Sequence, residues 1–389
     1  MLAPPRFVFL FELGVRRLFV SARPNSMRSR VSFLVLLAQS AAARHVVLSN
    51  VVLPLDQNNH SLITGEASVL ALGGFWYFYF NDWGSCPGVD CCDSAGGCAS
   101  CCFDNPPHPM QPCSDPYLQD HRVLAYRTKD LATWEYLGVA LPVSARPAGI
   151  VFRPCVVYNA KTGRFVMWFE DRGGGNSSSY YQVATANSPE GPFTVLPGGS
   201  GPMPGAGKIG DYSLFIDDDA TAYHIRYGFD LVRLNDEYTG AAGLVATLTT
   251  PKRSEGPTMF KRQGRYYITA GTVCCACLGG SSVYVLTATK PEGPWTYLGD
   301  VGSSPTRPYD PHSPLNYVTR SQGTAVFPVE NEFVYLGNVW NSGLARTPPG
   351  PRHHDLLYWG KLEFEAGAGR ILQMEWHENI TLELSDGVA

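Results

Sequence analysis

The sequence predicts an all-β fold, a five-bladed β-propeller, from three observations. After residue 45 no long amphipathic helical pattern occurs, and short alternating runs are bounded by Gly, Pro, Asp and Asn instead. A turn followed by an aromatic strand recurs along the chain, and the strands fall into five groups. The composition agrees, because 40 Gly, 30 Pro and 12% aromatic residues suit many short strands joined by tight turns.

The recurring unit is the strongest evidence for a propeller. Each copy follows a strand that carries Ala-Thr or Arg-Thr, contains a turn, and continues into a strand that begins with an aromatic residue. The three copies occupy residues 129–138, 188–196 and 290–299. Such a repeat is typical of the outer part of a propeller blade. A pair of β-sandwiches is the alternative, but it would leave the repeat unexplained.

The strand clusters divide the chain into five blades. Each cluster has room for about four strands, and residues 46–53 remain to close the ring. The clusters span residues 66–138, 151–196, 211–248, 255–298 and 322–376. We therefore expect one propeller domain over residues 44–389, with a Cys-rich loop insertion at about 83–118 in the first blade.

The N-terminal 43 residues have the layout of a targeting segment. The basic stretch Met27–Arg30 precedes an apolar run, Val31–Leu37, and the small residues Ala38–Ala43. Translation could begin at Met27, or residues 1–43 could act as one long signal. The apolar runs are shorter than the ~20 residues that a membrane span needs. We expect a secreted or lumenal protein, with a type II membrane anchor as the alternative.

The cysteines favour an oxidising compartment. Seven of the 11 lie in the insertion at 83–118, three lie at positions 274, 275 and 277, and Cys155 stands alone. Zinc binding is the rival interpretation, but adjacent Cys-Cys pairs and the absence of paired His at zinc-finger spacing favour disulfides. Sequons for N-glycosylation at Asn59, Asn176 and Asn379 agree with secretion.

The charge pattern narrows the partners. The net charge is −4, without long basic or acidic runs, so a nucleic-acid partner or a polybasic membrane surface is not expected. After removal of the signal we expect a monomer without membrane contact. The many aromatic residues suit a sugar-binding cleft, although a β-rich core would explain them equally well.

Two acidic residues at strand starts are candidates for catalysis. Glu255 directly precedes an apolar strand, where apolar walls would favour the protonated form of a carboxyl and make it a general acid. Asp211 opens another strand, at a position that would face a propeller's central channel. The alternative interpretation of Glu255 is an ordinary solvated residue in a turn. Asp217–Asp219 favours a β-turn over a metal site, because Asp is common in turns.

Taken together, the segments around these residues resemble glycoside hydrolase family 43. The resemblance is carried by the Asp-rich segment 211–223, the Glu-x-Pro strand at 255–257 and the Gly-Pro-Trp blade ends. It is sharper for the exo-β-1,3-galactanase-like branch, which residues 153–168, 321–324 and 335–340 resemble. The match runs from about residue 50 to 384. It implies a five-bladed propeller with a central pocket and an inverting mechanism, in which acid and base lie ~6.5–9.5 Å apart.

The resemblance also implies roles for individual residues. Glu255 matches the general acid, and Asp211 matches the carboxylate that orients that acid and tunes its protonation. Most of the family has an Asp as the base, whereas this branch has a Gln in that role, and Gln322 matches it. Gln322 would hold the attacking water through positioning or through its imidic tautomer. Glu66 aligns roughly with the base Asp of the wider family. It could restore a carboxylate base, or it could be a surface or channel-rim residue.

Four further residues are candidates for contact with the substrate: Arg153, Trp168, Tyr180 and Trp340. The two Trp side chains could stack on sugar rings or belong to blade cores. The chain departs from the branch at two nearby positions, because Phe152 replaces a Glu before Arg-Pro and Asn81 replaces an acidic residue.

The sequence thus predicts a secreted glycosidase that hydrolyses O-glycosyl bonds, exo-acting on β-1,3-galactan or a related polysaccharide. A non-catalytic glycan-binding propeller of the same family is the alternative, and an interaction scaffold that docks a partner through its Cys-rich loop is a third. No cofactor or metal is required by the sequence. Calcium in the channel, near His224 or His312, is conceivable, but no ligand spacing supports it.

Overall fold

The structure, a computed structural model, describes most of the unit formed by residues 42–389. The described residues are 44–82, 122–147, 150–172, 180–272, 279–306, 316–339, 355–367 and 369–385. The predicted signal segment and the ten clustered cysteines lie outside them, as do the sequon at Asn176 and His312. Among the residues described, no helix combines the length and the apolar character required to cross a bilayer.

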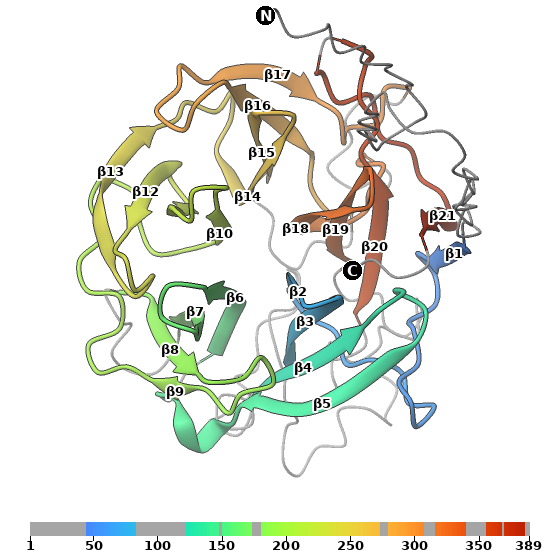
Figure 1. The fold of residues 1–389 in the computed structure, drawn as a ribbon. Helices are drawn as coiled ribbons and strands as arrows, with labels where there is room; N and C mark the ends of the chain where they lie inside the picture. The colour runs from blue at the N-terminus through green and yellow to red at the C-terminus, as the bar shows by residue number, and fades with distance from the viewer. Residues whose placement is uncertain are drawn as a thin grey trace, which may run out of the picture. The chain divides into compact units, whose positions relative to one another are not determined.

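The first three blades are four-stranded antiparallel sheets whose strands follow chain order (Figure 1). Blade 1 contains β2 (Ser68–Leu72), β3 (Phe75–Asp82), β4 (Arg122–Thr128) and β5 (Trp134–Leu141). Blade 2 follows a short 3₁₀ helix, η1 (Val143–Ala145), and contains β6 (Ile150–Asn159), β7 (Arg164–Arg172), β8 (Gln182–Ala186) and β9 (Thr194–Val195). Blade 3 contains β10 (Tyr212–Ile216), β11 (Ala222–Arg226), β12 (Asp230–Leu234) and β13 (Ala241–Thr247).

The last two blades differ in strand number. Blade 4 contains β14 (Ser254–Arg262), β15 (Arg265–Thr272), β16 (Tyr284–Ala288) and β17 (Thr296–Asp300). Blade 5 has three strands in its described part, β18 (Gln322–Val329), β19 (Glu332–Val339) and β20 (Leu356–Lys361). A separate two-stranded sheet pairs β1 (Arg44–Ser49) with β21 (Asn379–Leu384), which joins the two ends of the described chain.

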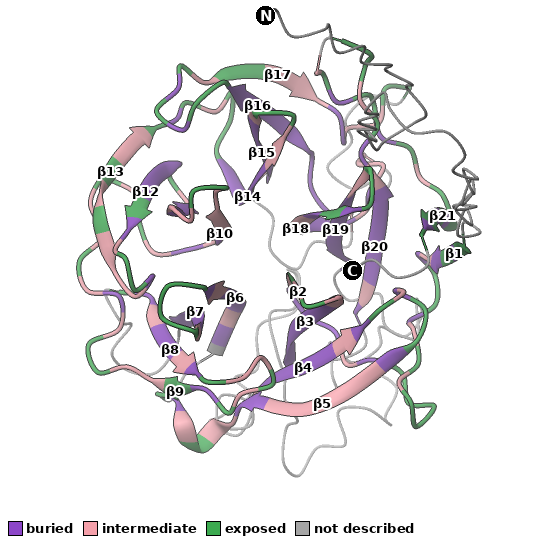
Figure 2. Ribbon diagram, viewed as in Figure 1, coloured by how far each residue is buried: buried purple, intermediate pink, exposed green. Residues whose placement is uncertain are grey.

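The five sheets form a ring, which confirms the predicted five-bladed propeller. The first strand of each blade is the innermost, and these strands contact one another in the cyclic order β2, β6, β10, β14, β18. The strands at the outside, such as β13, have alternating half-buried and exposed residues, whereas β11 and β16 are buried throughout. Figure 2 shows that burial is most complete in middle strands such as β16, whereas outer strands such as β5 and β13 are mainly half-buried or exposed. The first strand of every blade therefore presents its N-terminal end to one central region.

The repeated turns occupy equivalent places in three blades, as the sequence predicted. They connect the third and fourth strands, β4 to β5, β8 to β9 and β16 to β17. In two copies the aromatic residue closes the turn with the same bond, since the indole nitrogen donates to a carbonyl a few residues earlier. Trp134 donates to Leu131 O at 3.0 Å, and Trp295 donates to Pro291 O at 2.9 Å.

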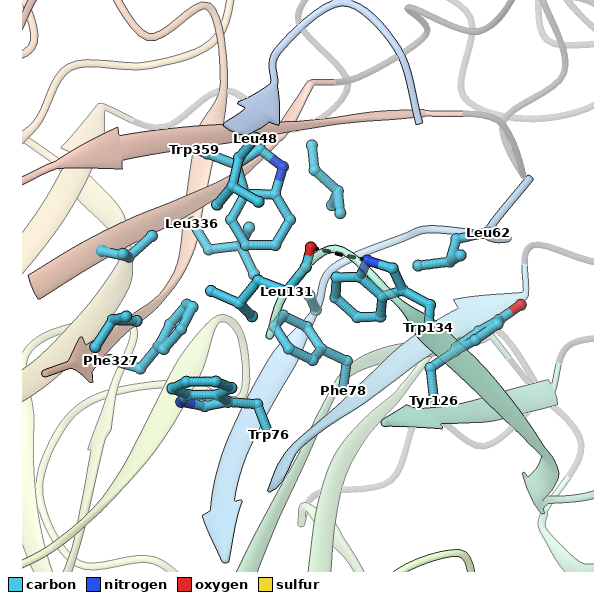
Figure 3. Close-up of a cluster of buried hydrophobic side chains, with 14 of the residues drawn as sticks. Leu48, Leu62, Trp76, Phe78, Tyr126, Leu131, Trp134, Phe327, Leu336 and Trp359 are labelled. Atoms are coloured by element: carbon cyan, nitrogen blue, oxygen red, sulfur yellow. Dashed lines mark hydrogen bonds between the residues drawn. The ribbon is translucent and has the colours of Figure 1, made fainter. Parts of the chain in front are cut away.

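The ring is closed by an apolar cluster between the first and last blades (Figure 3). Leu48 of β1 packs there with Phe78, Trp134 and Leu131 of blade 1 and with Trp359 of blade 5. The rings of Phe78 and Trp134 meet edge to face at 4.8 Å, a favoured aromatic arrangement. Residues 46–53 thus contribute to ring closure as expected, by packing and by pairing with β21.

Candidate active site

Five polar side chains converge at the centre of the ring, one from the start of each innermost strand. Glu66 lies just before β2, Arg153 lies in β6, Asp211 immediately precedes β10, Glu255 lies at the start of β14, and Gln322 begins β18. All five first strands run in the same direction, so residues near their starts meet at one end of the channel. The structure therefore brings together five of the eight residues that the sequence singled out.

Gln322 joins the two proposed catalytic carboxylates. Its Nε2 donates to Glu255 Oε1 at 2.8 Å and to Asp211 Oδ2 at 3.0 Å. The two carboxylate oxygens are consequently no more than 5.8 Å apart, the sum of these distances. Gln322 is only 1% exposed and Glu255 9%, whereas the Asp211 side chain is 17% exposed. The amide thus fixes the two carboxylates relative to each other at the edge of solvent.

Arg153 supplies the positive charge of the site. Its Nε lies 2.9 Å from Asp211 Oδ1 and 3.8 Å from Glu66 Oε1, and Nη1 donates to Gly323 O at 3.1 Å. Burial by itself would lower the pKa of Arg153, but the charges of Asp211 and Glu66 raise that pKa above its ordinary value. Arg153 therefore remains charged between the carboxylates and offsets their mutual repulsion.

Glu66 is sequestered beneath Arg153 rather than at the channel rim. It is 3% exposed, and its Oε2 accepts hydrogen bonds from Asn81 Nδ2 at 3.1 Å and from the Arg153 backbone N–H at 2.9 Å. Burial raises the pKa of Glu66 to about 8, an effect that Arg153 partly opposes and Asp211 reinforces. The interpretation of Glu66 as a surface or rim residue was wrong, because both its oxygens face buried donors or cations.

The backbone at the site has an unusual conformation. Glu66 and Arg153 have positive φ angles, 43° and 49°, in a region that non-glycine residues rarely adopt. A register shift lies between Phe152 and Cys155, and a matching one between Glu255 and Thr258. Such bulges change the direction of a strand and of its side chains. Here they turn Arg153 and Glu255 toward the centre.

Gly256 is closely packed between two other parts of this arrangement. Its φ of 61° favours glycine, and a Cβ there would lie 3.1 Å from Gly323 O and 3.3 Å from Arg153 Nη2. A side chain at this position would thus press on the Arg153 guanidinium. The Glu-Gly-Pro sequence positions the carboxylate of Glu255 and leaves room for Arg153 at the same time.

The three predicted aromatic contacts have different outcomes. Trp168 cannot stack on a sugar, because it is fully buried, its Nε1 donates to Tyr238 O, and it packs in the core between blades 2 and 3. This corrects its assignment as a substrate contact. Tyr180 is 38% exposed and remains a candidate for substrate contact. Trp340 lies outside the described residues.

Sequence reasoning missed the polar residues that support Glu66. The Glu66 backbone N–H donates to Asn338 Oδ1 at 3.3 Å, and Asn338 Nδ2 donates to Asp355 Oδ2 at 3.1 Å. Both residues are almost completely buried. Asn338 belongs to the 335–340 motif noted in the sequence, but nothing in that motif indicates that it reaches across to blade 1. The charge of the buried Glu170 also acts on Glu66.

The remaining candidates are structural in this fold. Asp217 and Asp219 form a turn, in which Asp217 N–H bonds to Thr221 O at 2.9 Å, as the sequence favoured. His224 is fully buried among the rings of Trp168, Tyr181 and Tyr212. Among the described residues no three His, Cys, Asp or Glu side chains form a group that could hold a metal ion. His224 therefore has no neighbouring ligand set in this part of the chain, and Cys155 forms no disulfide with another described residue.

Comparison with known families finds a family model that matches part of the sequence. A model described as glycosyl hydrolases family 43 matches residues 114–296. An arabinoxylan arabinofuranohydrolase of Bacillus subtilis is 26% identical over 231 residues, which cover 48% of this chain and 43% of that protein. The chain thus spans less than half the length of this curated relative.

Solved structures with the same fold include two exo-β-1,3-galactanases. The enzyme from Clostridium thermocellum is 23% identical with a TM-score of 0.65, and the match covers 88% of this chain and 68% of that one. The enzyme from Phanerochaete chrysosporium, solved with β-1,3-galactotriose, is 20% identical with a TM-score of 0.64, covering 88% and 69% of the two chains. At these identities the structures establish the five-bladed fold.

Proposed function

We propose that this chain is a member of glycosyl hydrolase family 43 and an inverting glycosidase that acts from the end of a β-1,3-galactan or a related polysaccharide. Glu255 protonates the leaving glycosidic oxygen. Asp211 and Gln322 hold that acid in place, and Gln322 positions the attacking water. The observation that carries the proposal is the pair of hydrogen bonds from the Gln322 amide to Glu255 and Asp211.

The separation of the two carboxylates supports the division of roles. In inverting glycosidases the acid and the base lie about 6.5–9.5 Å apart, so that a water molecule fits between base and sugar. The nearest oxygens of Glu255 and Asp211 are at most 5.8 Å apart. Asp211 is thus too close to Glu255 to act as a base across the sugar, whereas it is well placed to orient the acid.

Glu66 is a positioning residue in this proposal, not the base. A base must accept a proton from water, but the Oε2 of Glu66 already accepts two hydrogen bonds and its Oε1 lies 3.8 Å from Arg153 Nε. Its contacts are with the backbone and guanidinium of Arg153, which in turn contacts Asp211. Glu66 would therefore act by holding Arg153 in its strained backbone conformation.

The choice of substrate rests on resemblance. Solved relatives with this fold are named exo-β-1,3-galactanases, whereas the curated relative acts on arabinoxylan. A panel of β-1,3-galactan, other β-linked galacto-oligosaccharides and arabinose-containing polymers, each digested by wild type and Glu255→Gln, tests the proposal. We expect wild type to release sugar from β-1,3-galactan in the inverted anomeric form, as observed by ¹H NMR. Binding without hydrolysis on the whole panel would contradict an enzyme and support a glycan-binding propeller.

We also propose that the protein is exported and glycosylated. The leader-like segment and the clustered cysteines motivate this, and two sequon residues, Asn59 and Asn379, lie at exposed positions. Expression in a eukaryotic secretory host should give a protein whose mass falls after enzymatic removal of N-glycans. An unchanged mass would contradict glycosylation at these sites.

A further inference from the structure

A second pocket lies at the far end of blade 4 from Glu255. Its volume is about 340 Å³, and it is lined by the β14–β15 hairpin, including Arg262 and Arg265, and by residues 364–367 and Gly369. Glu255 is the second residue of β14 and Arg262 the last, so the two sites are about 20 Å apart at the usual rise of a strand. The pocket is therefore separate from the candidate active site.

Two arginines face each other in this pocket. Arg262 and Arg265 are directly paired across the hairpin, whose turn residues, Gln263 and Gly264, both have positive φ as in a tight two-residue turn. Directly opposite side chains share a face, and like charges in such a pair are destabilising. Among the described residues neither guanidinium forms an ion pair. The paired charges thus have no structural counter-ion in this part of the chain.

Three contacts connect the walls of the pocket to one another or to the adjoining chain. Tyr267 Oη donates to Gly369 O at 2.7 Å, and Phe364 forms a bridge with Ile371, which holds the segment beside the hairpin. The Arg262 guanidinium lies 4.1 Å from the centre of the Phe364 ring. Glu365 also lines the pocket but remains exposed. A largely preformed cavity of this size is typical of a small-ligand site.

We propose that this pocket is a second carbohydrate-binding site, specific for a sugar that bears an anionic group, either a uronate carboxylate or a sulfate ester. Guanidinium groups match the planar oxygens of both anions and bind them through two parallel hydrogen bonds. The cavity can hold one or two sugar rings. The inference that the anionic group belongs to a sugar rests on the proposed function, because a second binding site would help a polysaccharide hydrolase to hold its polymer.

Calorimetric titration at low salt tests the site. The probes are tetragalacturonate, a sulfated galactotetraose, a neutral β-1,3-galactotetraose and inorganic sulfate. We expect at least one acidic oligosaccharide to bind wild type, and Arg265→Gln to weaken that binding about tenfold or more, as expected for loss of a charge-assisted bond. Arg265→Lys keeps the charge but not the paired donors and should give only partial recovery. Arg233→Gln, at an exposed arginine of β12, is the matched control.

The outcomes separate this proposal from the catalytic one. Arg265→Gln should leave hydrolysis of a small neutral substrate unchanged, and Glu255→Gln should leave binding of the acidic oligosaccharide unchanged. The proposal is overturned if neither acidic probe binds, if inorganic sulfate binds as well as the oligosaccharides, or if Arg265→Gln and Arg233→Gln have equal effects. Failure of all hydrolysis with intact Arg265-dependent binding would instead contradict only the proposed catalytic function.

Discussion

Two buried glutamates of the central site, Glu255 and Glu66, have contrasting surroundings. Glu255 contacts the side-chain amide of Gln322, which also contacts Asp211, and it lies at the edge of solvent. Glu66 contacts the Arg153 backbone and Asn81 in the interior. The same residue type at equivalent strand starts thus has access to substrate in one case and a supporting position in the other. Partners and depth, rather than residue type, separate a candidate acid from a positioning residue.

Arg153 lies between the two glutamates, so its removal should have the largest effect on the free energy of unfolding. Arg153→Met leaves Glu66, Asp211 and Glu255 close together without a cation. We expect a loss of about 3–5 kcal/mol in the free energy of unfolding, as for a broken buried ion pair. Urea denaturation at neutral pH measures this. A loss below about 1 kcal/mol, similar to that of a surface arginine, would show that Arg153 does not hold the cluster together.

The next test compares the contributions of Gln322 and Glu66 to catalysis. Gln322→Ala removes the donor to both carboxylates, and we expect kcat to fall about 10²-fold, comparable with loss of one preorganised donor. Glu66→Gln keeps shape and should lower kcat by less than about tenfold. The two variants are compared on the substrate identified by the panel. A deeper defect in Glu66→Gln than in Gln322→Ala would make Glu66 the base.

Glu66 also predicts a pH dependence of stability. Its pKa is raised by burial to about 8 in the folded state, above the ordinary 4.5, so the folded state holds the proton more tightly. The stability contribution of Glu66 is therefore complete below about pH 4.5 and is lost as the pH rises through 8. Between pH 5 and 7 wild type should lose about 2–3 kcal/mol relative to Glu66→Gln. Parallel pH profiles for the two proteins would exclude this burial effect.

His224 should give a smaller effect of opposite sign. Burial among aromatic rings, with a contribution from Arg226, lowers its pKa to about 3 from the ordinary 6.5. Stability from neutral His224 is present above about pH 6.5 and declines as the pH falls toward 3. The free energy of unfolding of His224→Phe minus that of wild type should therefore be about 1 kcal/mol larger at pH 5.5 than at pH 7.5. Any packing penalty of the larger ring is the same at both pH values and cancels in this comparison. An equal difference in the free energy of unfolding at the two pH values would refute the prediction.

The sequence was sufficient for the fold because its signals are local and repeated. Alternating strands and the Trp134 and Trp295 turns are encoded within short segments, and these determined the number of blades. Glu255, Asp211 and Gln322 were also found, since strand starts of a propeller meet at its centre. The burial of Glu66 could not be predicted, because Asn81, Arg153 and Asn338 reach it from three blades. Trp168 likewise shows that an aromatic strand alone does not distinguish a core residue from a sugar platform.

The proposed roles of the two glutamates depend most on Glu255 being the general acid. The kinetics of Glu255→Gln on two substrates with the same sugar test this directly. One substrate has a sugar leaving group, and the other has dinitrophenolate, which leaves without protonation. We predict a loss of about 10²–10⁴-fold in kcat/KM on the first substrate and a loss at least tenfold smaller on the second. Equal losses on both substrates would contradict the assignment of Glu255 as the acid.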